Sequence, residues 1–229
     1  MRILKWFQQR DAEMSVRVGK ARNNTVRLTG AACTGSFLLG CGKLIVGVLS
    51  ASFFTCANAF YTFGMVAAKL CALKGIAVPA SKRYSYYRIT AGILIAASLC
   101  YAFYAFRLLL HPEQPHYNIY MGLPIAAFAF TEIGLNIRGI LIERRSGQLM
   151  FHAIKMVNLA SSLICLVLTQ TALLSFTATD AEQNFSAANG TLGLLMGSVA
   201  ALIGIFMFRH VSKLEKQEKN DDSHFSSRR

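Results

Sequence analysis

Six long apolar runs constrain the fold of this chain more than any other feature of its 229 residues. Each run supplies about the 20 residues that an α-helix needs to cross the hydrocarbon core of a bilayer. The runs cover roughly residues 28–49, 53–73, 89–110, 118–142, 151–176 and 190–208. Charged residues make up only 15% of the chain, whereas soluble domains have about 25%. The sequence therefore predicts an all-α fold, a six-helix transmembrane bundle.

The positive charges between the runs predict the topology. Lysine and arginine gather at the N-terminus, in a basic loop over 74–88, around 138–145 and in the C-terminal tail. These places hold all but four of the 24 Lys and Arg residues, the exceptions being Lys43, Lys69, Arg107 and Lys155. Because segments rich in lysine and arginine stay on the cytoplasmic side of a membrane, both the N- and the C-terminus are expected to be cytoplasmic.

The same pattern divides the chain into three parts. We expect a basic cytoplasmic N-terminal segment over 1–27, a six-span transmembrane domain over 28–209 and a charged cytoplasmic tail over 210–229. Apolar residues recur at roughly helical spacing in 1–27, which fits an amphipathic helix on the membrane surface. A basic tail that only keeps the N-terminus inside explains the same residues.

The expected partners follow from this charge distribution. They are the lipid bilayer, anionic lipid head groups that meet the basic segments and, as a further option, a second copy in a homodimer. Nucleic acid is not expected, although the net charge is +13, because the basic residues lie in short segments between apolar runs. The expected location is the plasma membrane, as a multi-pass protein.

Other motifs point to packing rather than to chemistry. Gly193, Gly197 and Ala201 form a stripe of small residues, which lets membrane helices approach closely. The six cysteines lie inside apolar runs without a CxxC pattern, so we interpret them as packing residues. No metal site, cofactor or enzymatic motif is expected, and the chain is not predicted to be an enzyme.

Glu132 is the one acidic residue inside an apolar run. A carboxylate at that depth costs about 2.5–3.5 kcal/mol unless it is paired or hydrated. It is therefore a candidate proton relay or cation site, although a structural salt bridge or a neutral, hydrogen-bonded Glu132 would also explain it. Lys43 has no acid at its own depth, so it either pairs obliquely with Glu132 or faces a wet cavity.

Further polar residues extend the list of candidates for a transport pathway. Lys155 and His152 lie at the start of the fifth run, and Asn58 lies in the second. Lys69 and Lys155 are expected about 6 Å from the inner edge, where a lysine can extend its ammonium group to the water. Asn58 and Asn136 are more typical of hydrogen bonds between helices than of ligands.

The layout resembles the cation diffusion facilitator family of zinc and manganese exporters. The shared features are six spans, two inner termini, a very short first outer turn and the frame of the second span, which begins at Ala51-Ser52. In that frame Asn58 stands at the first acidic position, and Tyr61 and Met65 stand at two metal-ligand positions.

The fifth span supplies the other two ligand positions in the resemblance, Lys155 for His and Leu159 for Asp. None of the four ligands that the family uses is present, and the chain ends without the family's cytoplasmic domain. The resemblance therefore implies a transporter of protons, monovalent cations or another small solute rather than zinc. The alternative is a non-transporting structural or regulatory protein on the same scaffold. Convergence of the four positions, together with Glu132, in a wet cleft would favour transport, whereas their convergence in a dry apolar core would argue against a transport pathway.

Overall fold

The computed structural model describes residues 26–27, 29–110, 119–143, 149–177 and 186–226. Within these ranges all regular structure is α-helical and no strand occurs, which confirms the all-α prediction. The predicted amphipathic helix over 1–27 lies almost wholly outside the described residues.

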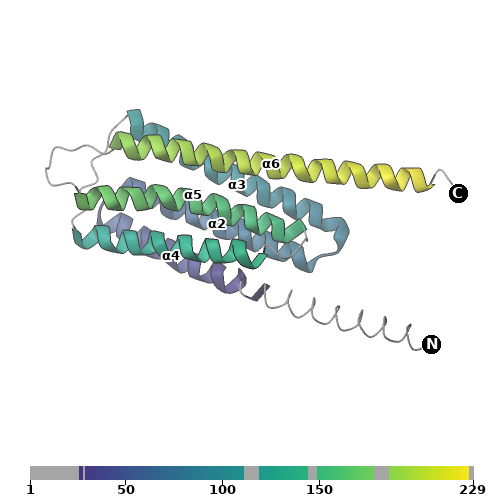
Figure 1. Ribbon diagram of the computed structural model, residues 1–229, viewed down its shortest axis with the longest axis horizontal. Helices are drawn as coiled ribbons and strands as arrows, with labels where there is room; N and C mark the ends of the chain where they lie inside the picture. The colour runs from purple at the N-terminus through teal and green to yellow at the C-terminus, as the bar shows by residue number, and fades with distance from the viewer. Residues whose placement is uncertain (1–25, 28, 111–118, 144–148, 178–185, 227–229) are drawn as a thin grey trace.

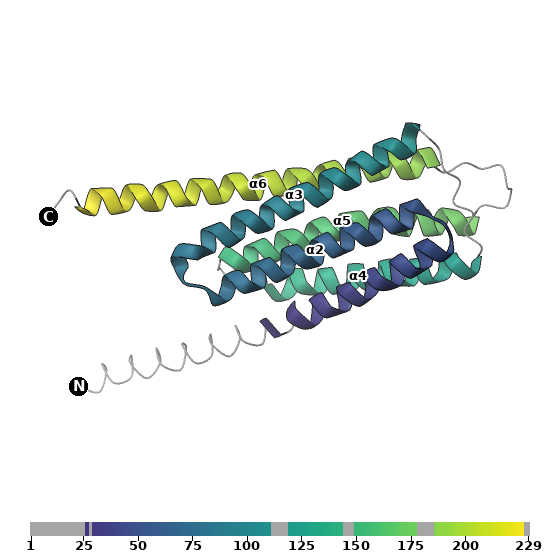
Figure 2. The same cartoon turned by 180° about the vertical axis from the view of Figure 1, so that it is seen from behind.

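The helices of the described residues run alternately up and down a common axis (Figure 1). A first helix, Thr29–Leu49, is followed by α2 (Phe53–Ala77), α3 (Ala80–Leu110), α4 (Ile119–Glu143), α5 (Leu149–Thr177) and α6 (Ser186–Ser226). The first helix begins, and α6 ends, at the same end of the bundle, which we name the tail end. The opposite end, which carries the connection from Leu49 to Phe53, is named the turn end (Figure 2).

Five helices are long and apolar enough to cross a membrane. These segments are Thr29–Leu49, Phe53–Ala77, Lys82–Leu110, Leu149–Thr171 and Ala187–Gln217. The helical bundle is therefore compatible with a multi-pass membrane protein in a lipid bilayer. α4 is not among the five segments.

Three helix boundaries differ from the sequence prediction, because helices continue beyond the apolar runs. The predicted loop over 74–88 is reduced to Val78 and Pro79, because α2 continues to Ala77 and α3 already begins at Ala80. α6 continues through most of the predicted tail to Ser226. Lysine, glutamate and glutamine are good helix formers, so a helix continues in water beyond the point where apolar residues end.

The connection between the first helix and α2 is the tight turn that the sequence predicts at Ser50-Ala51-Ser52. Ala51 has a φ of 49°, the left-handed conformation of a chain that reverses sharply. Ser52 caps α2, its Oγ accepting a hydrogen bond from the Thr55 backbone N–H at 3.3 Å. The turn therefore brings the end of the first helix against the start of α2.

The helices pack in adjacent pairs around a shared apolar core. α3 contacts α2 and α6, and α5 contacts α2, α4 and α6. Tyr61, Leu94, Ile154 and Met207 belong to one buried cluster of these helices. The first helix covers α2 and α4, since a Cβ added at Gly40 would meet Phe63 and one at Gly42 would meet Phe128.

The stripe of small residues in α6 lies against α3, as the packing interpretation predicts. A Cβ at Gly193 would be 3.1 Å from the Ala105 Cβ, and one at Gly197 would be 3.1 Å from the Ala102 Cβ. One turn beyond the stripe, a Cβ at Gly204 would be 2.6 Å from Ile95 Cγ1 and 3.2 Å from the Ile95 backbone nitrogen. The contact between α3 and α6 therefore depends on glycine.

Substitution at Gly204 tests this close approach. Gly204→Leu is expected to lower the melting temperature in detergent, since overpacking of a well-packed contact costs about 1–3 kcal/mol. Gly92→Leu is the matched control on α3, because nothing lies within 4 Å of a Cβ added there. Equal melting temperatures for the two variants would contradict the packing described.

Candidate functional site

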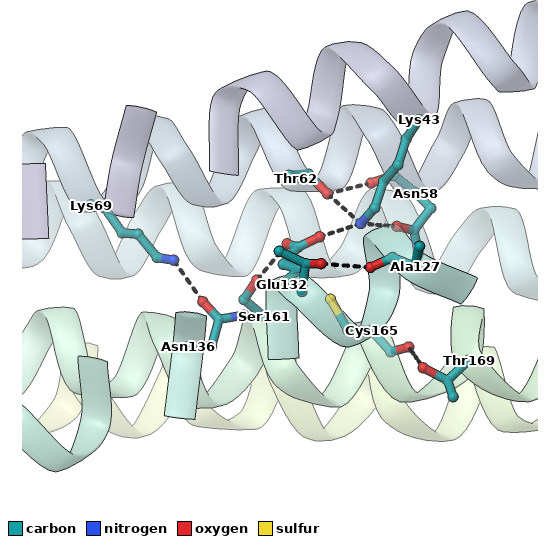
Figure 3. A network of polar contacts seen from close by, with 11 residues as sticks. Lys43, Asn58, Thr62, Lys69, Ala127, Glu132, Asn136, Ser161, Cys165 and Thr169 are labelled. Atoms are coloured by element: carbon teal, nitrogen blue, oxygen red, sulfur yellow. Dashed lines mark hydrogen bonds and ion pairs between the residues drawn. The ribbon is translucent and has the colours of Figure 1, made fainter. Parts of the chain in front are cut away.

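Lys43 places a fully buried ammonium group between the first helix, α2 and α4. Its Nζ donates to Asn58 Oδ1 at 2.9 Å, to Thr62 Oγ1 at 3.2 Å and to Glu132 Oε2 (Figure 3). An ammonium group has three N–H donors, so these three acceptors satisfy it completely. The predicted oblique pairing of Lys43 with Glu132 is confirmed.

The Glu132 carboxylate is 1% exposed and is also held by α5. The Ser161 hydroxyl donates to Oε1 at 3.1 Å, while Oε2 receives the Lys43 ammonium. The buried Cys165 side chain also interacts with this carboxylate. The ion pair therefore connects four helices: the first helix, α2, α4 and α5.

Glycine on the first helix allows Lys43 to reach this position. Gly40 and Gly47 lie one turn to either side of Lys43 and both face α2. A Cβ at Gly47 would be 3.0 Å from the Cys56 backbone nitrogen, which shows how closely the two helices approach there. A long lysine stem can then run into the interior and place its charge at the depth of Glu132.

Lys69 forms a second buried contact, nearer the tail end. Its Nζ donates to Asn136 Oδ1 at 2.8 Å, and the residue is only 2% exposed. The prediction that Lys69 extends to the water is therefore wrong. Because α2 continues to Ala77, Lys69 lies about 12 Å from the helix end at 1.5 Å per residue, too deep to reach it.

These contacts place two groups of polar side chains in a file along the inside of the bundle, one around Lys43 and Glu132 and one formed by Lys69 and Asn136. We name it the polar file; its members are Lys43, Asn58, Thr62, Lys69, Glu132, Asn136 and Ser161. On α4, Glu132 and Asn136 are four residues apart and thus share a face. Asn58 and Asn136 both bond across helices, as the sequence predicts.

The four positions that the family resemblance aligns with metal ligands do not converge. Tyr61 and Met65 are buried in the apolar cluster of α2, α3, α5 and α6, and the Tyr61 hydroxyl donates to the Ala160 carbonyl at 3.3 Å. Leu159, by contrast, is 40% exposed, and Lys155 lies on the same side of α5, four residues earlier. In α5 it is Ser161 and Cys165 that face Glu132.

His152 lies apart from the polar file, at the tail end. Its Nδ1 is 2.9 Å from the Tyr87 hydroxyl, and its ring centroid is 5.7 Å from that of His210 on α6. The adjacent Arg88 and Glu215 form an ion pair at 2.5 Å. These contacts hold the extended end of α6 against α3 and α5.

Sequence reasoning missed Thr62, Ser161, Tyr87 and His210 as members of these clusters. Small hydroxyl residues occur throughout the apolar runs, so neither Thr62 nor Ser161 gives a signal. The spacing of four between Asn58 and Thr62 could have indicated a polar face on the second run.

Metal and thiol chemistry gain no support from the described residues. No group of three or more His, Cys, Asp and Glu side chains within them is placed to hold a metal ion. The six cysteines are free thiols, and Cys165 is buried beside Glu132.

Comparisons with known proteins identify no family for this chain. No family model matches it, and no curated protein matches it significantly.

The stability of the ion pair can be tested by removing its charges singly and together. Glu132→Gln or Lys43→Met alone is expected to destabilise the protein by about 3–5 kcal/mol, because each change leaves the other charge of the pair buried without its counter-charge. The double variant Lys43→Met/Glu132→Gln is expected to recover most of that loss. Thermal unfolding in detergent gives the comparison. Additive losses in the double variant would show that the pair is not coupled.

Proposed function

We propose that this protein is a six-span membrane transporter of a small solute, with the Lys43–Glu132 pair as the site whose opening is coupled to transport. One observation carries the proposal: within the described residues, three charged side chains, Lys43, Lys69 and Glu132, are buried inside the bundle. Helices in lipid associate through close packing of small residues. Buried charges are costly there and mark solute or proton pathways in membrane proteins.

The location of the pair supports a coupling role. Its partners come from four helices, so protonation of Glu132 or an exchange of partners by Lys43 changes contacts on all four at once. Such a cluster links a local charge event to a rearrangement of helices. In the structure the pair is buried and hydrogen-bonded, so transport through this site would require the pair to open.

The relationship to cation diffusion facilitators remains part of this proposal and rests on the layout of the spans and the frame of the second span. The chemistry of the polar file favours a solute other than zinc. Two lysines and one glutamate give it a net positive formal charge, which repels divalent cations.

A purely structural role is the second candidate, and the completeness of the Lys43 contacts favours it. All three ammonium donors have acceptors, as in a buried pair that only fixes the register of neighbouring helices. A structural protein would show the destabilisation described above but no flux of any ion.

We also propose that α4 is the sixth span and that both termini are cytoplasmic. With 25 residues, α4 is about 37 Å long, enough to cross a hydrocarbon core of about 30 Å. Leu123, Phe130, Ile137 and Leu141 are 48–67% exposed along it, as expected of a helix that meets lipid. Lys74, Lys82, Arg83 and Arg209 near the tail end favour that end as cytoplasmic.

Cysteine labelling tests this topology. In a cysteine-free background, Gln114→Cys and Gly147→Cys place thiols in the segments before and after α4. If α4 spans the membrane, a membrane-impermeant maleimide added to whole cells labels Gln114→Cys but labels Gly147→Cys only after permeabilisation. Labelling of both from outside would contradict the proposal. Fluorescence microscopy of a tagged chain tests the predicted plasma-membrane location.

Flux through the purified protein tests transport. Proteoliposomes in metal-free buffer are tested with imposed H⁺, Na⁺, K⁺ and Cl⁻ gradients. We expect flux of one of these ions, reduced at least tenfold by Ser161→Ala, because this change removes the hydrogen bond to Glu132 while leaving both charges in place.

Ser162→Ala is the matched control for this measurement. The Ser162 hydroxyl donates to the Asn158 carbonyl of its own helix, so its loss leaves the ion pair intact. Equal flux in the two serine variants would remove Glu132 from the pathway. The absence of flux for every ion would support the structural alternative.

A further inference from the structure

We propose that Glu132 has a second ammonium partner, Lys69, and that its carboxylate exchanges Lys43 for Lys69 when the ion pair opens. Lys69 and Asn136 are then positioning residues, which hold the carboxylate in a second place. The inference rests on the proposed function and deepens it, because it says how the Lys43–Glu132 pair opens without leaving a carboxylate unpaired inside the bundle.

The Glu132 carboxylate is attracted by both lysines in the structure. Lys43 donates to its Oε2 atom directly, and Lys69 acts electrostatically on the same carboxylate. All three side chains are at most 2% exposed, so water screens these attractions little. The ammonium groups come from different helices, that of Lys43 from the first helix and that of Lys69 from α2, nearer the tail end (Figure 3). One carboxylate thus lies between two cations.

Asn136 connects the two places that the carboxylate can occupy. It follows Glu132 by four residues on α4, the spacing at which side chains of one helix contact each other. A lysine ammonium group offers only donors, so its contact with Asn136 at 2.8 Å is made by the amide oxygen, Oδ1. The Nδ2 atom of this amide is buried and has no hydrogen-bond partner among the described residues. Lys69 and Asn136 therefore present a positive charge and an N–H donor about one helical turn from Glu132.

An acceptor is what the Asn136 Nδ2 atom lacks, and Glu132 is the carboxylate within reach. A buried N–H group without an acceptor is costly. Side chains of a helix lean toward its N-terminus, so the Asn136 amide leans toward the turn that carries Glu132. A rotation of the Glu132 side chain gives Nδ2 its acceptor and brings the carboxylate to Lys69.

The exchange keeps the Lys43 ammonium group hydrogen-bonded. Lys43 retains its bonds to Asn58 and Thr62 of α2 when the carboxylate leaves. The contacts that end are those of Glu132 with Lys43 on the first helix and with Ser161 on α5. α4 is thereby released from these two helices while it stays bonded to α2. Such an element with two discrete arrangements is what a conformational switch requires.

A double-mutant cycle in the thermal unfolding of the full-length protein tests the second place without a flux measurement. Lys43→Met removes the first partner of Glu132, so the carboxylate turns to Lys69 and Asn136. Asn136→Leu removes the amide of the second place and changes no charge. We expect the melting temperature in detergent to fall further in Lys43→Met/Asn136→Leu than the two single variants together predict, because the carboxylate then has neither place intact.

Asn58→Leu is the matched control, because Asn58 is a buried asparagine that accepts from Lys43 itself. Combined with Lys43→Met it removes the same hydrogen bond twice, so the double variant is expected to lose less than the sum of its single variants. Lys43→Gln, which keeps a donor for Glu132, replaces Lys43→Met in both cycles if a double variant does not fold. Additive or smaller losses with Asn136→Leu would overturn the inference.

Asn136→Asp separates the exchange from a structural role. A fixed carboxylate in the second place binds Lys69 and repels Glu132, which then stays with Lys43. We expect this variant to melt no lower than the wild type, because it balances the buried charges, and to lose flux at least tenfold in the proteoliposome measurement. Wild-type flux in Asn136→Asp would contradict the exchange.

The cycle and the flux measurement fail independently. A loss beyond additivity in the cycle, with no flux of any ion by the wild type, would establish the second place of Glu132 and reject transport. Additive losses, with wild-type flux that Ser161→Ala reduces, would reject the exchange and leave the proposed function in place.

Discussion

The hydrocarbon core of a bilayer supplies no water to buried polar groups, so a charged group inside a membrane bundle needs partners within the protein. Lys43 meets this requirement with three acceptors, which come from α2 and α4. Glu132 in turn accepts from Ser161 on α5. The mutual position of four helices is therefore determined by one ammonium group and one carboxylate, since a rotation of any of these helices would leave a charge without its partner.

This requirement also explains where the glycines of the first helix lie. The lysine stem is long enough to reach Glu132 only if the first helix approaches α2 closely. Gly40 and Gly47 make that approach, against Phe63 and the Cys56 backbone respectively. The close helix contact and the buried charge are thus one arrangement, in which the small residues bring the ammonium group to its acceptors.

The sequence predicts the helices and the ion pair well, but not the surroundings of the pair. Glu132 is the one carboxylate within an apolar run, so its partner had to be one of very few lysines. Ser161 could not be predicted, because a neutral hydroxyl has no signature among apolar residues. The inner face of α5 was also hidden, since a helix in lipid is apolar on both its buried and its exposed side. Lys69 was misplaced because α2 continues beyond the predicted end of its run to Ala77.

The two halves of the polar file differ in how completely their hydrogen-bonding groups are matched. A structural ion pair needs matched donors and acceptors, and the half around Lys43 and Glu132 has them. The half around Lys69 and Asn136 has a second ammonium group and an amide N–H₂ without an acceptor. An interior built only for stability would gain from an apolar residue at either position. The first half is therefore suited to hold helices together, whereas the second half keeps a buried amide N–H₂ for which the described residues provide no acceptor.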